Sequence, residues 1–119
     1  MTGNEILQQA LSFLGYSESN GNAQLSQRVL QKALPLVNLV YGDIKRMCGV
    51  DAEPLKSIMD EIKTPEKAND VFACGVASYI AATEGDDANQ AFWGAEYATR
   101  KTLLSRRVEV KDTLPIPEY

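Results

Sequence analysis

The chain has 119 residues, 45% of them hydrophobic and 24% charged, with a formal net charge of −4 and a pI near 4.8. These values are typical of a single globular domain and exclude a chain that is disordered throughout. The acidic balance argues against non-specific binding to nucleic acid or anionic lipid, and no run approaches the ~18 apolar residues of a membrane span. We also expect no secretory signal, because the first residues lack a basic segment followed by a continuous apolar one.

A first helix is predicted over residues 4–14. Thr2 or Asn4 can cap its first turn, and Gly15 supplies a residue that tolerates the positive φ of a helix end. Between them, apolar residues recur at the three- and four-residue steps of one helix face: Ile6, Leu7, Ala10, Leu11 and Leu14. The polar, glycine-containing residues that follow predict a loop.

The longest helix is predicted over residues 23–48, with one apolar stripe through Leu25, Val29, Ala33, Val37, Val40, Ile44 and Met47. Pro35 lies inside it, and because proline removes a backbone donor we expect a kink or a break at residues 31–34. Three further leucines lie off the main stripe: Leu34, Leu36 and Leu39. A helix that is apolar on more than one face should be surrounded, either by its own domain or by a neighbouring subunit.

Residues 49–64 lose the helical pattern and predict a loop that contains, at most, a short helical turn. The third helix is predicted to run from Thr64, as its cap, and Pro65, in the first helical position, to about Glu84. Small residues dominate its centre, so we expect another helix to pack closely against Gly75. Close packing would offset the ~1 kcal/mol that a glycine costs inside a helix relative to alanine.

The segment AATEGDDA at residues 81–88 separates the third helix from a fourth, predicted over residues 87–105. Gly85 can end the third helix, and Asp86 or Asp87 can cap the fourth. Such a short connection makes the two helices an antiparallel hairpin. The competing interpretation, a metal site, lacks the alternating oxygen ligands and the distant bidentate glutamate of a calcium loop.

The fourth helix is expected to face the third, with Trp93 and Tyr97 at the edge of the contact. The residues of this expected contact face are Ala91, Phe92, Ala95, Ala98, Thr99 and Thr102. A basic run near the end of the helix is interpreted as a solvated helix end that complements the macrodipole: Arg100, Lys101, Arg106, Arg107 and Lys111. The aromatic residues could form a platform for nucleic-acid bases, but acidic neighbours oppose phosphate, so we expect packing.

The final residues, 106–119, are predicted to leave the helix as an extended arm. Valines alternate with charged residues at its start, and two prolines further on cannot continue a helix. We therefore expect an all-α fold in two parts, a bundle of about four helices at 1–105 and the arm at 106–119. The arm either folds back on the bundle or binds a partner surface. In the second case its partner-binding residues are Val108, Val110, Leu114, Ile116 and Tyr119.

Residues suited to catalysis are scarce. The chain has no histidine, which serine and cysteine nucleophiles usually recruit as a base, and a zinc site would have to combine two separated cysteines with carboxylates. No glycine motif for phosphate is present. We therefore expect no enzyme, no cofactor and no metal, with a small enzyme or cation-binding protein as a competing class. Cys48 and Cys74 on apolar faces indicate a reducing compartment, and a disulfide between them is the alternative.

An ordered pattern runs through residues 54–103. A lead-in of Pro-Leu, Asp-Glu-Ile and Pro precedes a helix of the form G-x-A-x-x-[IL]-A, then an acidic Gly-Asp turn and a helix with a phenylalanine and a tyrosine. These residues are Pro54, Leu55, Asp60, Glu61, Ile62, Pro65, Gly75, Ala77, Ile80, Ala81, Gly85, Asp86, Phe92 and Tyr97. In this order the pattern resembles that of the small helical head-tail connector proteins of tailed phages, the adaptor or head-completion proteins. The first half of the chain is similar only in being helical.

The resemblance implies a virion structural protein that acts by assembly rather than catalysis. Its copies would form a homo-oligomeric ring at the head-tail junction, between the portal protein and the tail or the next connector ring. DNA would pass through the ring without specific binding, which suits an acidic channel wall, and no membrane would be involved. The protein would be made in the host cytoplasm. The alternative is a non-virion phage protein, such as a tail-assembly chaperone or a DNA-packaging accessory protein, acting by protein-protein interaction.

Overall fold

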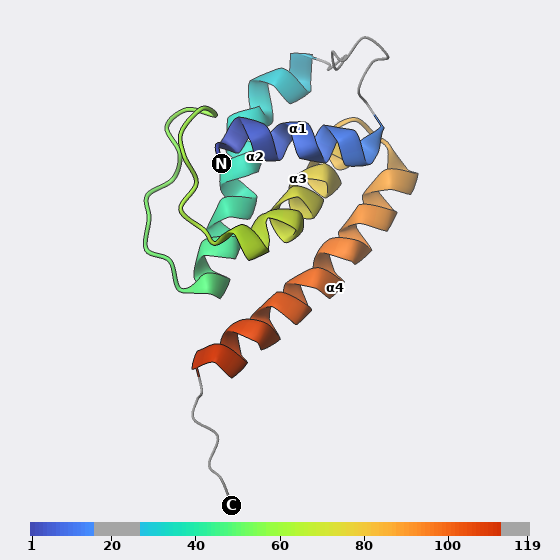
Figure 1. Ribbon diagram of the computed structural model, residues 1–119. Coiled ribbons are helices and arrows are strands. Elements are labelled where there is room, and N and C mark those ends of the chain that lie inside the picture. Colours follow the sequence, from blue (N-terminus) through green and yellow to red (C-terminus); the bar gives the residue numbers. More distant parts are fainter. Residues whose placement is uncertain (16–26, 113–119) are drawn as a thin grey trace, which may run out of the picture.

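The computed structural model describes residues 1–15 and 27–112, and the side chains of residues 1–15 and 31–106 among them. It is the all-α bundle that the sequence predicted, with four α-helices and one short 3₁₀ turn (Figure 1). The elements are α1 (Gly3–Leu14), α2 (Gln27–Cys48), η1 (Glu66–Ala68), α3 (Asn69–Thr83) and α4 (Asp87–Asp112). The described ranges contain no strand, only an isolated antiparallel bridge between Thr2 and Glu61.

The first helix has the caps that its sequence indicates. The Thr2 hydroxyl accepts the backbone N–H of Glu5, and the Glu5 carboxylate accepts the backbone N–H of Thr2, which completes a capping box. Gly15 ends the helix with a φ of +73° and donates its backbone N–H to the carbonyls of Leu11 and Ser12. All five residues of the predicted apolar face are buried, so α1 lies against the bundle through that one stripe.

The second helix passes Pro35 without a break. Pro35 is exposed, and α2 continues as one helix from Gln27 to Cys48, so of the two expectations at this proline the break is wrong. On the predicted stripe, Val37, Val40 and Ile44 are completely buried. Leu39, off that stripe, is 53% exposed. The second apolar face is therefore only partly covered by the described part of the chain.

The third helix lies at the centre of the bundle and contacts α1, α2 and α4 (Figure 1). Its middle is buried on nearly all sides, because the small side chains of Ala73, Cys74, Gly75 and Ala77 let three neighbours approach. Its predicted cap at Thr64 is wrong. The chain instead turns at Pro65 into η1, and α3 begins at Asn69 without a side-chain cap.

The fourth helix is longer than the sequence analysis expected. The helix was expected to end at residue 105 and an extended arm to begin at 106, but α4 continues to Asp112, so residues 106–112 are helical. No glycine or proline occurs at residues 106–114, and basic residues at a helix C-terminus complement its dipole. Two alternating valines were too short a pattern to predict an extended segment. The last turns of α4 project beyond the other helices (Figure 1).

The face of α4 that meets α3 is also not the expected one. Tyr97 and Leu104 are buried and Trp93 is half-buried against the core, whereas all six residues of the expected contact face are exposed. Burying a large aromatic or leucine side chain removes more apolar area from water than burying alanine or threonine. Tyr97 and Leu104 therefore face the core, whereas Phe92 stays exposed together with the small residues of the expected face.

Residues 49–64 connect α2 to η1 as an irregular segment without a helix, as predicted. Its backbone is bonded to the start of the chain: the Gly3 N–H donates to the Asp60 carbonyl, and the Ile62 N–H donates to the Met1 carbonyl. Side chains of α2 hold it from the other side. The connector is therefore an ordered part of the bundle surface despite having no regular structure.

Candidate functional site

The acidic corner between α3 and α4 is built as a pair of helix ends. Gly85 follows α3 with a φ of +71°, and its backbone N–H donates to the Ala82 carbonyl. Asp86 then caps α4: its carboxylate accepts the backbone N–H of Asn89 at 3.3 Å and the side-chain amide of the same residue at 2.7 Å. Among the described residues no group of three or more metal-ligating side chains is found, here or elsewhere.

Gly75 lies at the closest point between three helices. A β-carbon added to it would stand 2.8 Å from Cε1 of Tyr97 on α4 and 2.8 Å from Cγ1 of Val40 on α2. Real β-carbons essentially never come this close to other atoms, so the site admits no side chain. The Tyr97 ring fills the space that the missing side chain leaves, and its hydroxyl donates to Asp43 of α2 at 3.1 Å.

The ionisable groups near the contact between Gly75 and Tyr97 do not form a catalytic pair. Burial raises the pKa of the Tyr97 hydroxyl above its usual range, and the neighbouring Asp43 carboxylate raises it further. Burial likewise raises the pKa of the Cys74 thiol to about 11, although the positive charge of Arg100 opposes the shift. Both groups are therefore neutral at pH 7, and neither is an activated nucleophile.

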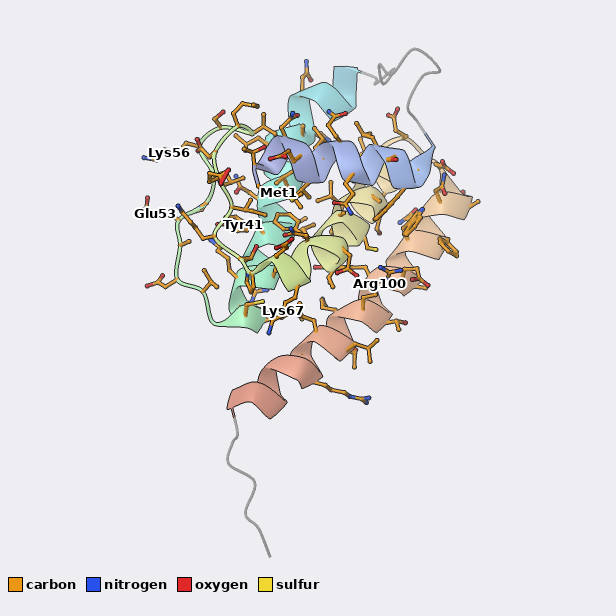
Figure 2. The ribbon with its side chains drawn as sticks, viewed as in Figure 1. Met1, Tyr41, Glu53, Lys56, Lys67 and Arg100 are labelled. Atoms are coloured by element: carbon orange, nitrogen blue, oxygen red, sulfur yellow. The ribbon has the colours of Figure 1, made fainter. Side chains whose placement is uncertain are left out.

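Arg100, labelled in Figure 2, joins α4 to α3 by an ion pair with Asp70 and also pairs with Glu96 within α4. Its guanidinium bonds the Asp70 carboxylate at 2.9 Å and the Glu96 carboxylate at 3.1 Å. Lys101 lies 3.6 Å from the Asp43 carboxylate. The first two residues of the basic run thus belong to the contact between α4 and the bundle rather than to a solvated helix end.

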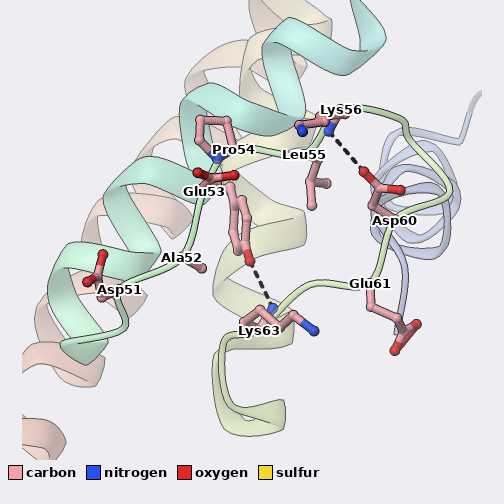
Figure 3. A pocket seen from close by; sticks show the side chains of 10 residues that line it. Asp51, Ala52, Glu53, Pro54, Leu55, Lys56, Asp60, Glu61 and Lys63 are labelled. Carbon is pink, nitrogen blue, oxygen red and sulfur yellow. Dashed lines mark hydrogen bonds between the residues drawn. The ribbon is translucent and has the colours of Figure 1, made fainter.

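A groove of about 690 Å³ lies between α2 and the irregular segment at residues 49–64 (Figure 3). Tyr41 is one of its lining residues, and the Tyr41 hydroxyl accepts the backbone N–H of Lys63 at 2.9 Å. On the rim, Asp60 accepts the backbone N–H groups of Lys56 and Ser57. These polar groups hold the connector in its shape, so the groove is a structural feature with charges of both signs around it.

A smaller polar recess of about 310 Å³ lies at the start of α3. Two of its lining residues, Thr64 and Asn69, each bury an oxygen that has no hydrogen-bond partner in the described part of the chain. Met1 and Glu66 complete the lining. The hydroxyl that the sequence analysis assigned to a helix cap lies in this recess instead.

The predicted partner-binding residues fall into two groups. Val108 and Val110 lie in the last turns of α4, on helical rather than extended backbone. The other three lie outside the described residues: Leu114, Ile116 and Tyr119.

Sequence reasoning missed the exposed surface of α4. We call it the outer face, and it consists of Ala88, Ala91, Phe92, Ala95, Ala98, Thr99, Thr102 and Leu103. Phe92 is 56% exposed and Leu103 is 44% exposed. The aromatic residues beside it are packing elements, since Trp93 stacks on Phe13 of α1 with ring centroids 4.8 Å apart. The small residues at helical spacing along α4 were visible in the sequence, but they were expected to face α3 rather than to be exposed.

The protein is an all-α bundle, and the described part of it presents exposed apolar surfaces and capped helix ends. Within that part, no helix combines the length and the apolar character that crossing a membrane requires. Comparison of the chain with family models, with curated proteins and with solved structures found no match.

Proposed function

We propose that this protein is a head-tail connector of a tailed phage, an adaptor whose copies form a ring between the portal protein and the tail or the next connector ring. The observation that carries the proposal is the order of the pattern at residues 54–103. In the fold, the proline-flanked lead-in of the pattern lies in the irregular segment at residues 49–64. Its G-x-A helix is the central α3, and its Gly-Asp turn is the corner that starts α4. The pattern thus follows one continuous unit of structure.

The surfaces of the chain suit a protein that acts by assembly and needs no cofactor. Leu39, Met59 and Phe92 are large apolar residues that the described part of the chain leaves more than half exposed. Exposed apolar side chains on different elements give a small domain several places for neighbours. The net charge of −4 would let DNA slide through a ring without adhering to its wall.

In this proposal the end of the chain contacts a neighbouring subunit, the portal protein or the next ring. The contact would use Leu114, Ile116 and Tyr119 beyond α4, with Val108 and Val110 on its last turns. A proline-containing segment with alternate apolar residues can lie along a partner surface as an added strand. Because α4 projects beyond the bundle, it would carry this segment away from the core (Figure 1).

The first test is to compare phage particles and assembly intermediates made with and without this protein, by electron microscopy and by protein content. A ring at the head-tail junction, together with heads that leak DNA or fail to join tails in its absence, is the expected result. Absence from mature particles would contradict the adaptor and would favour the alternative, a non-virion assembly or DNA-packaging accessory protein.

A second test removes residues 113–119. This truncation starts after the last residue of α4, so it leaves every described helix intact. We expect an unchanged circular dichroism spectrum and melting temperature, together with loss of incorporation into particles. The matched control is the double substitution Glu53→Ala and Lys56→Ala, which removes two exposed charges from the irregular segment at residues 49–64 (Figure 2). Normal incorporation of the truncated chain would contradict the role of the arm.

A further inference from the structure

The polar recess of about 310 Å³ at the start of α3 brings together two residues with unpartnered oxygens. The hydroxyl oxygen of Thr64 and the side-chain carbonyl oxygen of Asn69 are buried, and neither has a hydrogen bond in the described part of the chain. Thr64 as a whole is only 9% exposed. Because a buried polar atom without a partner destabilises the folded state, such atoms are nearly always bonded to protein, water or a ligand. The recess therefore offers two acceptors to a group that donates.

The backbone around both residues is held in place. Before Thr64, the Lys63 N–H donates to the Tyr41 hydroxyl at 2.9 Å, and after it the Ala68 N–H donates to the Pro65 carbonyl at 3.0 Å. Asn69 is the first residue of α3, so the helix fixes its backbone. Side chains on a fixed backbone lose less freedom when a ligand arrives, which lowers the cost of binding.

The charge of the lining favours a cation. Glu66, in η1, contributes an exposed carboxylate. Met1 also lines the recess, but its ammonium group is paired with the Glu61 carboxylate at 3.2 Å, so that positive charge is already matched. The helix dipole at this end amounts to about half a positive charge, which is less than the full negative charge of one carboxylate. The recess therefore disfavours an anion.

The kind of cation follows from the acceptors. Calcium and magnesium prefer several carboxylate oxygens, whereas only one carboxylate lines the recess with its charge unmatched. In the described ranges no group of three metal-ligating side chains occurs. A primary ammonium group has one positive charge, three N–H donors and no acceptor, which matches one carboxylate and two neutral oxygens. The volume of about 310 Å³ also leaves room for the alkyl stem of an amine.

We propose that this recess binds a primary ammonium group, with the oxygens of Thr64 and Asn69 and the carboxylate of Glu66 as its three acceptors. The group belongs either to a free alkylamine or to a lysine side chain of another protein, since both present the same three donors. The site goes beyond the proposed function and does not rest on it. A chain absent from phage particles would still have the recess.

The test is an NMR titration of the full-length chain with methylammonium chloride, up to about 100 mM, in which weak binding by mass action is measurable. The backbone amide signals of Thr64, Glu66 and Asn69 should shift and saturate. Potassium chloride and tetramethylammonium chloride, a cation without N–H donors, are the controls at equal ionic strength and should not shift them. Nα-acetyl-lysine amide separates the sources: tighter binding than methylammonium indicates a lysine side chain, and weaker binding indicates a free amine.

Substitutions test the three acceptors. Glu66→Gln should weaken methylammonium binding at least about tenfold, because a hydrogen bond to a charged group is lost. Thr64→Val should also weaken it, yet it should not lower the melting temperature without amine, since it removes a buried hydroxyl that has no partner. The matched control for Glu66→Gln is Glu53→Gln, an exposed carboxylate outside the recess, which should bind normally.

Three results overturn the proposal. The first is the absence of a saturable shift at the three amides, and the second is an equal shift with potassium or tetramethylammonium. The third is native affinity in Glu66→Gln or in Thr64→Val. A melting temperature lowered by several degrees in Thr64→Val overturns it as well, because the hydroxyl would then be bonded within the chain.

Discussion

Gly75 of α3 and Tyr97 of α4 are fitted to one another: the tyrosine ring occupies the space that any side chain at position 75 would need. A β-carbon there would lie 2.8 Å from the ring and equally close to Val40 on the other side. Neither neighbour can yield by a simple rotation, since one is a ring held by a hydrogen bond to Asp43 and the other is a fully buried valine. The packing of three helices therefore depends on one missing side chain.

Gly75→Leu should lower the free energy of unfolding by about 3 kcal/mol or more, because four added carbons must push α2 and α4 away from α3. Urea denaturation followed by circular dichroism measures the change. The control is Gly42→Ala in α2, where an added β-carbon meets nothing within 4 Å. It should raise the free energy of unfolding by about 0.5–1 kcal/mol through helix propensity. Near-normal stability of Gly75→Leu would show that the helices are not closely packed there.

Tyr97→Phe should lower the free energy of unfolding by about 1–2 kcal/mol at pH 7, because it removes the hydrogen bond that the hydroxyl donates to Asp43. The loss is limited because Asp43 keeps its ion pairs with Arg46 and Lys101. Urea denaturation at pH 7 gives the value. A cost of more than about 4 kcal/mol would mean that the ring had also moved, since a single hydrogen bond does not account for so much.

The same residue should make the protein sensitive to alkali. The pKa of Tyr97 is raised in the folded state by burial, then by Asp43, above the ordinary tyrosine value of 10.0. A raised folded pKa contributes stability that is fully present below the unfolded pKa and is lost as pH rises above it toward the folded one. The stability difference between the native chain and Tyr97→Phe should therefore narrow above about pH 10. A constant difference from pH 7 to pH 11 would contradict the raised pKa.

Asn38→Ala should release the connector from α2. The Asn38 side chain donates to the Leu55 carbonyl at 2.9 Å and accepts the Leu55 N–H at 2.8 Å. Loss of both bonds should cost about 1–3 kcal/mol. It should also speed tryptic cleavage after the exposed Lys56, because the backbone can open locally. Gln31→Ala, exposed on the same helix, is the control and should change stability by less than about 0.5 kcal/mol.

Asp86→Ala should cost about 0.5–2 kcal/mol, because the first turn of α4 loses the carboxylate that accepts the Asn89 N–H. Differential scanning calorimetry measures the shift. Calcium or EDTA should leave the melting temperature of the native chain unchanged, since the carboxylate is a helix cap. If calcium raised the melting temperature of the native chain by several degrees but not that of Asp86→Ala, the corner would be a cation site and the cap interpretation would be wrong.

The two thiols should react at different rates with an aromatic disulfide reagent at pH 8. Both cysteines are free thiols. Cys74 is completely buried and its pKa is raised to about 11, whereas Cys48 is only half-buried. Cys48 should react first, and Cys74 only when the chain unfolds. In Cys48→Ser the remaining thiol should stay unreactive until urea is added. Equal rates for the two thiols in the native chain would contradict the burial of α3.

The sequence by itself determined the elements whose signals are local. The apolar face of α1 and the glycine at its end were local signals that predicted the helix, and the structure then showed that Thr2 rather than Asn4 is its cap. The corner at Gly85 and Asp86, the irregular connector and the all-α class follow in the same way from short patterns. These features require no knowledge of what lies nearby in space.

Only the tertiary structure decided which face of α4 is covered. Along that helix, alanines and threonines with Phe92 and Leu103 form one stripe, and Trp93, Tyr97 and Leu104 form another, so helical periodicity alone allowed either to be buried. The choice fell to Tyr97 because Gly75 left room for a ring beside Val40. The tertiary structure also decided the place of Thr64. Its hydroxyl was a plausible helix cap by sequence, but the chain turns at Pro65 into η1, so Thr64 caps no helix. Long-range packing sets both outcomes, because the free energy of burying a side chain depends on the partner that it meets.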